Sequence, residues 1–159
     1  MTRPKPTAVV PLLAAVFALM VATLTSCGQR PSAGKKPVVA AILAVTGSAD
    51  YIGKPESLVL NALWKDHQNR AGVPFELEIY DSAGDPDQAR KLFEDLCRRQ
   101  EVVAVIGPST SGESIPLVQI ATERRVPLLS LAASKKIVLN DNKHAYEWAF
   151  KFAQNDDLA

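Results

Sequence analysis

The sequence contains few of the residues that form metal sites and disulfide frameworks. Its 159 residues include two cysteines, Cys27 and Cys97, and two histidines, His67 and His144. These four residues lie far apart along the chain, so they form no spacing that is typical of a zinc site or of a disulfide framework. We therefore expect no metal, no cofactor and no disulfide bond, and we interpret both histidines as surface residues.

The chain also lacks an excess of charge of either sign. Eighteen Lys and Arg residues stand against 17 Asp and Glu residues, which gives a formal net charge of +1. Basic pairs such as Lys35-Lys36 and Arg98-Arg99 are too sparse to form the clustered basic surface that nucleic-acid binding requires. We therefore expect no nucleic-acid partner.

The N-terminal segment has a different character from the rest. The first 27 residues have no acidic side chain, and their only charged side chains are Arg3 and Lys5. Residues 8–24 then form an apolar run that is interrupted only by Pro11 and Thr23. A short positive start before such a run is typical of a secretory signal peptide.

The end of this run, Leu24-Thr25-Ser26-Cys27, resembles the lipobox of bacterial lipoproteins. The resemblance implies that residues 1–26 are a lipoprotein signal peptide and that Cys27 carries a lipid that anchors the chain to the membrane. The alternative is an uncleaved transmembrane anchor, because residues 8–24 approach spanning length. Residues 27–36 are predicted to be a flexible tether. Both interpretations place the folded part outside the cytoplasm.

Residues 37–159 are predicted to form one folded unit in which apolar runs alternate with helical patterns. Such an alternation indicates an α/β fold. The predicted strands are residues 38–45, 75–80, 102–106, 126–131 and 146–152, the last with Trp148, Phe150 and Phe152 on one side. The strand at 75–80 alternates apolar and acidic residues, which favours an edge position.

Helices are predicted after each of the first three strands. The first begins at Pro55 and ends near Arg70, before Ala71 and Gly72. The second begins at Asp85, with Gln88 completing a capping box, and buries a stripe formed by Ala89, Leu92, Phe93, Leu96 and Cys97. The third follows the turn at residues 107–110, and its predicted inner face comprises Ile115, Val118 and Ala121.

Right-handed crossovers and these strand characters predict a doubly wound, mostly parallel five-stranded sheet with the strand order 2-1-3-4-5. Ligands bind such sheets outside the carboxyl ends of the strands, where the strand order reverses. Three predicted loops open at this edge: residues 46–54, 108–112 and 132–134. Their small and hydroxyl side chains favour close approach of a ligand to the backbone.

The stretch from Glu101 to Ser114 is the strongest candidate for a binding site. Five apolar residues, 102–106, are followed by Gly107-Pro108. Ser109, Thr110 and Ser111 then lead into a helix. Hydroxyl groups and unpaired amides at a helix N-terminus can bind an anion such as a ligand carboxylate. The same hydroxyls could instead cap the helix, and at Ser111 both roles are possible.

Known catalytic motifs do not match this stretch. The run G-P-S-T-S-G lacks the glycine spacing of a dinucleotide fingerprint, and no Gly-Lys-Ser/Thr follows it. No serine lies in a G-x-S-x-G elbow, and no histidine is suitably placed in the sequence to activate one. We therefore predict that the protein is not an enzyme.

Four segments, each next to one of the first four predicted strands, occur in an order that points to a family. They are V-T-G-S-A-D-Y-I-G, Y-D-S-A-G-D-P-D-Q-A, V-I-G-P-S-T-S and S-L-A-A-S. Together they resemble the leucine/isoleucine/valine-type (type I) periplasmic binding proteins of ABC transporters. The resemblance extends from about Val38 to the end of the chain.

The resemblance implies that a hydroxyl of the third-strand loop and an A-A-[ST] loop hold the α-carboxylate and α-amino group of an amino acid. Carried over by motif, the ligand-binding positions are Ser111, Ala132, Ala133 and Ser134, and Tyr51 lies near the position of a family aromatic residue. Well-studied members join the loops after the second and third strands by a disulfide. Here those positions are Gly84 and Thr110, so that bridge is not expected.

Members of this family close two lobes over the ligand, and the closed form is what the membrane permease recognises. We expect this chain to be the N-terminal lobe alone, a truncated form with half of the site and weak binding. The predicted function is the substrate-binding component of an ABC importer for amino acids of the branched-chain type or related small carboxylates or amides. The alternative is the ligand-sensing domain of a receptor with the same fold.

Overall fold

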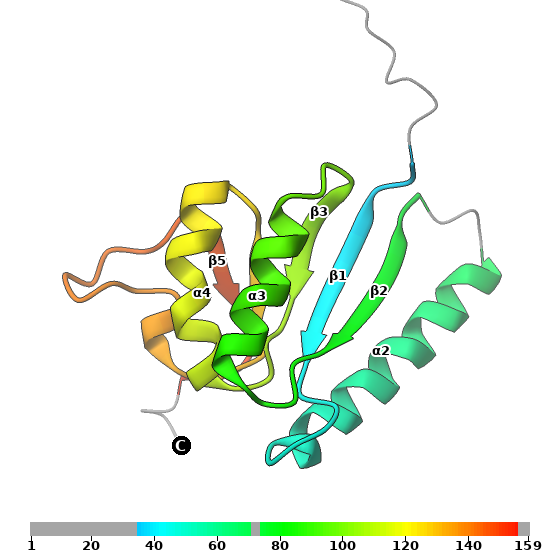
Figure 1. Ribbon diagram of the computed structural model, residues 1–159, viewed down its shortest axis with the longest axis horizontal. Coiled ribbons are helices and arrows are strands. Elements are labelled where there is room, and N and C mark those ends of the chain that lie inside the picture. The colour runs from blue at the N-terminus through cyan, green and yellow to red at the C-terminus, as the bar shows by residue number, and fades with distance from the viewer. Residues whose placement is uncertain (1–34, 71–73, 156–159) are drawn as a thin grey trace, which may run out of the picture. The chain divides into compact units, whose positions relative to one another are not determined.

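The computed structural model describes residues 35–70 and 74–155 (Figure 1). The predicted signal peptide, Cys27 and most of the predicted tether lie outside these residues, as do Ala71 and Gly72. Within the two described ranges, no helix has the length and apolar character needed to cross a membrane.

Five parallel strands form one sheet. They are β1 (Val38–Leu43), β2 (Glu76–Asp81), β3 (Val102–Ile106), β4 (Leu128–Ser130) and β5 (Ala149–Lys151). Their spatial order is β2-β1-β3-β4-β5, and every neighbouring pair is parallel. The predicted α/β fold and strand order are therefore confirmed, including the edge position of β2. The order reverses between β1 and β3, which defines the switch point of the sheet.

Three α-helices and one short 3-10 helix connect the strands. They are α2 (Asp50–Arg70), α3 (Pro86–Cys97), α4 (Ser111–Arg124) and η1 (Lys135–Ile137). Figure 1 shows α3 and α4 side by side across one face of the sheet. The core lies between these two helices and the strands, and its largest fully buried side chains include Phe93, Ile42, Leu117, Leu128 and Ile137.

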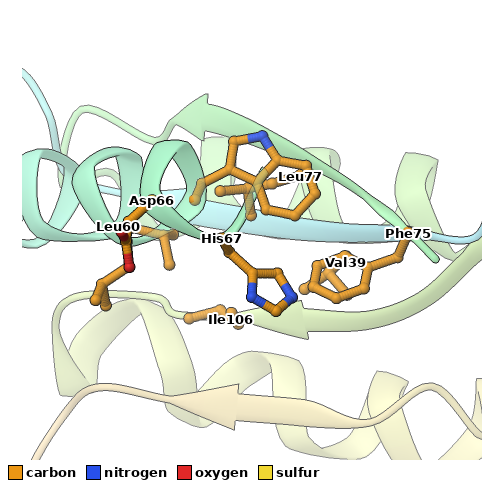
Figure 2. A pocket seen from close by; sticks show the side chains of 9 residues that line it. Val39, Leu60, Asp66, His67, Phe75, Leu77 and Ile106 are labelled. Carbon is orange, nitrogen blue, oxygen red and sulfur yellow. The ribbon is translucent and has the colours of Figure 1, made fainter. Parts of the chain in front are cut away.

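The helix α2 covers the opposite face of the sheet only in part. At its start it lies close to the end of β1, since a Cβ atom added to Gly53 would come within 2.2 Å of the Ala44 carbonyl oxygen. Farther along, a groove of about 340 Å³ separates α2 from the sheet (Figure 2). The groove is lined by Val39, Leu60, Leu63, Trp64, Asp66, His67, Phe75, Leu77 and Ile106.

Two helix predictions need correction. The helix α2 begins at Asp50 and not at Pro55. Its first turn already forms there, because the Ala49 carbonyl accepts hydrogen bonds from the N–H groups of Ile52 and Gly53. In α4, Ile115 is 38% exposed, so its predicted place on the inner face is wrong. Leu117, Val118 and Ala121 form the buried stripe instead, and Glu113 and Ser114 occupy the inner surface nearer the N-terminus of the helix.

The start of α3 follows its prediction in part. Asp85 caps the helix by accepting hydrogen bonds from the N–H groups of Asp87 and Gln88, and Pro86 is its first residue. The predicted capping box is wrong, because the Gln88 side chain donates to the Asp81 carbonyl at 2.8 Å. The N–H of Asp85 donates to the Ser82 carbonyl instead.

The last two strands are shorter than predicted. Pro127 has no N–H to contribute, so β4 begins at Leu128, although the Pro127 carbonyl still accepts a hydrogen bond from the Val105 N–H at 2.9 Å. The strand β5 begins at Ala149, although the Trp148 carbonyl still accepts a hydrogen bond from the Leu128 N–H at 2.8 Å. Trp148 is half-buried and packs against the core, whereas Phe150 and Phe152 are exposed.

Candidate ligand-binding site

Three loops meet at the carboxyl edge of the sheet, because β1, β3 and β4 run in the same direction. They follow β1 at residues 44–49, β3 at 107–110 and β4 at 131–134. Gly107 takes a positive φ of 92°, and a Cβ atom there would lie 2.0 Å from the Ile42 carbonyl oxygen. Only glycine fits this close approach, so the loop after β3 lies directly against β1 at the switch point.

Thr110 caps the helix α4. Its hydroxyl oxygen accepts a hydrogen bond from the Glu113 N–H, and the Glu113 side chain accepts one from the Thr110 N–H, which completes a capping box. The two amides that precede Glu113, those of Ser111 and Gly112, remain directed out of the helix N-terminus. A Cβ atom added to Gly112 would meet no atom within 4 Å, so this end of the helix is open.

Ser111 joins the loop after β3 to the loop after β4. Its hydroxyl oxygen accepts a hydrogen bond from the Ser134 N–H at 3.2 Å. This hydrogen bond uses the Ser111 oxygen as an acceptor and does not involve its hydroxyl proton. Ser134 is almost buried, and its own hydroxyl oxygen accepts from the Lys136 N–H at 3.4 Å and caps η1.

Side chains from neighbouring elements hold the loop at residues 131–134 in place. The Ala132 N–H donates to Ser130 Oγ at 3.1 Å, and Ser130 Oγ lies 2.7 Å from Ser114 Oγ. On the other side, Lys151 Nζ donates to the Ala133 carbonyl at 2.5 Å. Ala132 is buried and Ala133 is half-buried. Hydrogen bonds within the chain therefore hold the backbone of this loop in place.

Tyr51 lies in the first turn of α2 and is 74% exposed. Within the described residues it forms no hydrogen bond with Ser111 or Ser134. The structure thus brings Ser111 and Ser134 together and places Ala132 and Ala133 beside them. The ligand contact of Tyr51 stays a prediction.

The loop after β3 also contacts two glutamates that the sequence did not indicate. Ser109 Oγ donates to Glu56 Oε2 at 2.5 Å, and Ser82 Oγ donates to Glu113 Oε1 at 2.5 Å. Burial raises the pKa of Glu56, the hydrogen bond from Ser109 opposes this rise, and the nearby Glu113 carboxylate adds to it. The T-x-x-E pattern at residues 110–113 is the sequence signal that could have identified Glu113.

The described residues offer no arrangement for a metal ion, since no three His, Cys, Asp or Glu side chains within them are grouped to hold one. What the carboxyl edge offers is a hydroxyl donor, free amides at the start of a helix and a fixed backbone of small residues. These groups suit the binding of a small anion or a carboxylate.

Comparison with known proteins decides the family. The model of the periplasmic binding protein family matches residues 37–158. The chain belongs to this family. The match includes all five strands and the three loops at the carboxyl edge, and the family consists of binding proteins and not of enzymes.

Solved structures share the fold of this chain. An extracellular ligand-binding receptor from Rhodopseudomonas palustris HaA2 is 27% identical, with a TM-score of 0.67 over 79% of this chain and 34% of its own. The branched-chain amino acid transporter substrate binding protein LivJ from Streptococcus pneumoniae, solved with isoleucine, is 22% identical, with a TM-score of 0.67 over 77% of this chain and 35% of its own. This chain therefore spans about a third of the length of these proteins.

A curated relative comes from a different functional class. Glutamate receptor 2.8 of Arabidopsis thaliana is 30% identical over 82 residues, which make up 52% of this chain and 9% of the receptor. Part of this chain is thus similar in sequence to a short part of a receptor.

Proposed function

We propose that this chain provides one lobe of an extracytoplasmic substrate-binding protein for an ABC importer. Its ligand is an amino acid of the branched-chain type or a related small carboxylate or amide. The ligand carboxylate accepts hydrogen bonds from the Ser111 hydroxyl and from the amides at the N-terminus of α4. Ala132, Ala133 and Ser134 contribute the second side of this half-site, and Tyr51 borders it.

The hydrogen bond between Ser134 N–H and Ser111 Oγ is the observation that carries this proposal. It consumes an acceptor site of the Ser111 oxygen and leaves the hydroxyl proton, so Ser111 approaches the ligand as a donor. Since Thr110 caps the N-terminus of α4, the Ser111 hydroxyl is not needed as a cap. A donor beside a helix N-terminus suits a carboxylate.

Lipid on Cys27 anchors the chain to the bacterial membrane in this proposal, with the folded part outside the cytoplasm and an ABC permease as the partner. Mass spectrometry of the expressed chain tests the anchor: a diacylated or triacylated Cys27 at a new N-terminus supports it. An unmodified chain that retains residues 1–26 contradicts it.

The ligand-sensing domain of a receptor is the second candidate, and the similarity to a plant glutamate receptor favours it. A permease gene beside the reading frame favours the importer. A receptor requires a membrane-spanning segment after the sensing domain, so an in-frame continuation of that kind would favour the receptor.

Titration with L-isoleucine and L-leucine, followed by amide NMR spectra of the 159-residue chain, tests the site. We expect the amides of Ser111, Gly112 and Ser134 to shift, with a dissociation constant on the order of 1 mM, because contacts from one lobe give modest affinity. Isobutylamine, which lacks the carboxylate, is the control and is expected to leave these amides unchanged. Shifts confined to other parts of the chain would contradict the proposed site. A micromolar dissociation constant would contradict the proposal that this chain holds only half of the site.

A further inference from the structure

Glu113 links two loops at the carboxyl edge of the sheet. It is fully buried, and its two carboxylate oxygens accept hydrogen bonds from different directions. Oε1 accepts from Ser82 Oγ at 2.5 Å, and Oε2 accepts from Thr110 Oγ1 at 2.7 Å and from the Thr110 N–H at 3.2 Å. The loop after β2 is thereby tied to the residue that immediately precedes Ser111.

Glu56 forms a second link to the same loop. Its Oε2 accepts a hydrogen bond from Ser109 Oγ at 2.5 Å, and Ser109 Oγ in turn accepts from the Ala44 N–H at 3.1 Å. Ser109 is only 5% exposed. This chain of hydrogen bonds connects α2, the end of β1 and the loop after β3.

The two links exceed what helix capping requires. A capping box needs only the bonds between Thr110 and Glu113, whereas the bond to Ser82 spans 31 residues of sequence. Burial of a carboxylate is unfavourable unless hydrogen bonds satisfy its oxygens, and Glu113 has three such donors. Two consecutive residues, Ser109 and Thr110, therefore have their hydroxyl groups fixed by carboxylates, and Ser111 follows directly.

We propose that Glu113 and Glu56 are positioning residues that hold residues 107–110 so that the Ser111 hydroxyl faces the ligand. Neither glutamate touches the ligand, and each acts through the hydroxyl that it fixes. This inference rests on the proposed role of Ser111, but the loop geometry that it explains exists without ligand. It can therefore be tested in the unliganded chain.

Hydrogen exchange of single amides, measured by NMR on the full 159-residue chain, tests the inference. In Glu113→Ala, the Thr110 amide is expected to exchange about tenfold faster or more, because it loses a charged acceptor. Glu113→Gln keeps an acceptor oxygen and is expected to restore most of the protection. Glu56→Ala is expected to shift the Ser109 and Ala44 amides and to leave Thr110 protected.

The matched control is Glu123→Ala, a substitution in the same helix. It removes an exposed carboxylate that accepts a hydrogen bond from the Gln119 side chain. It is expected to leave the exchange of Thr110 and Ala44 unchanged. Unchanged Thr110 exchange in a folded Glu113→Ala chain would overturn the inference, and so would an equal loss of protection in β1 and α3.

If Glu113→Ala does not fold, Ser82→Ala decides the question, because it removes one donor and leaves the carboxylate hydrogen-bonded to Thr110. We expect a smaller but specific increase in Thr110 exchange, and no increase would count against the inference. The isoleucine titration is a separate measurement. A wild-type chain that shows no shifts with isoleucine would contradict the proposed function without altering the exchange result.

Discussion

The Ser134 N–H donates a hydrogen bond to Ser111 Oγ at 3.2 Å and joins two loops that lie 23 residues apart in the sequence. Ser111 opens α4, and Ser134 precedes η1, so the bond connects the starts of two helical segments. The bond uses the Ser111 oxygen as an acceptor, so it does not engage the hydroxyl proton. A contact within the protein thus joins two residues of the proposed half-site.

Ser111→Ala tests the role of this hydroxyl. The variant removes both the donor to the ligand and the acceptor of the Ser134 N–H, so we expect isoleucine affinity to fall about tenfold or more. Ser111→Thr retains a hydroxyl and is expected to restore part of the affinity. NMR titration measures both, with Thr122→Ala in the same helix as the control, since the Thr122 hydroxyl donates to the Val118 carbonyl within that helix. Equal affinity in Ser111→Ala and wild type would exclude Ser111 from the site.

The sequence predicted the strand order and the three loops because these depend on patterns of several residues. The apolar runs at 38–43 and 102–106 and the alternation at 76–81 each appear in consecutive letters. The burial of Glu113, in contrast, cannot be read from consecutive residues. A glutamate is ordinarily predicted at the surface, and its burial depends on Ser82, which lies 31 residues away.

The sequence alone likewise could not decide which of the hydroxyl groups of Ser109, Thr110 and Ser111 caps the helix. The sequence left capping and ligand contact open at Ser111, since several neighbouring hydroxyls can cap a helix. The structure assigns the cap to Thr110 because its backbone is extended and its side chain reaches the Glu113 N–H. Contacts of Glu56 with Ser109 span 53 residues, so no local pattern could have indicated them.

Phe93 is expected to be a main determinant of stability. It is fully buried in α3 against the sheet, and Phe93→Ala removes its ring from the core and leaves a cavity. We expect the free energy of unfolding to fall by about 3–5 kcal/mol. Phe152→Ala is the matched control, because Phe152 is 73% exposed and its loss is expected to change stability by less than about 0.5 kcal/mol. Urea denaturation measures both, and similar losses in the two variants would contradict the assigned core.

Cys97 is expected to react slowly with alkylating reagents. Burial raises the pKa of the Cys97 thiol to about 11, against a lowering effect of Arg124. Since the thiolate is the reactive form, the rate at pH 8 is expected to be roughly a hundredfold below that of an exposed cysteine. Peptide mass spectrometry after a timed iodoacetamide reaction measures the rate, with glutathione in the same mixture as the reference. Equal rates for Cys97 and glutathione would show that the thiol is accessible and ionised.

The ion pair between Glu78 and Arg99 is expected to make stability depend on pH. Arg99 donates two hydrogen bonds to the Glu78 carboxylate, at 2.6 and 2.9 Å, and the Tyr80 hydroxyl donates a third. The hydrogen bonds from Arg99 and then from Tyr80 lower the pKa of Glu78 to about 2. The folded state therefore favours the charged carboxylate more than the unfolded state does, and the stabilisation is present above the ordinary pKa of 4.5.

Glu78→Gln is accordingly expected to destabilise the fold by about 1 kcal/mol near neutral pH, since both partners are about one-third exposed and solvent screens the pair. The difference between wild type and variant is expected to shrink as the pH falls from 4.5 toward 2, because the wild-type carboxyl becomes protonated. Urea denaturation across this range measures the difference. Asp95→Asn, which breaks the more exposed ion pair between Asp95 and Arg98, is expected to have no measurable effect. A destabilisation by Glu78→Gln that stays constant down to pH 2 would mean that packing and not charge accounts for it.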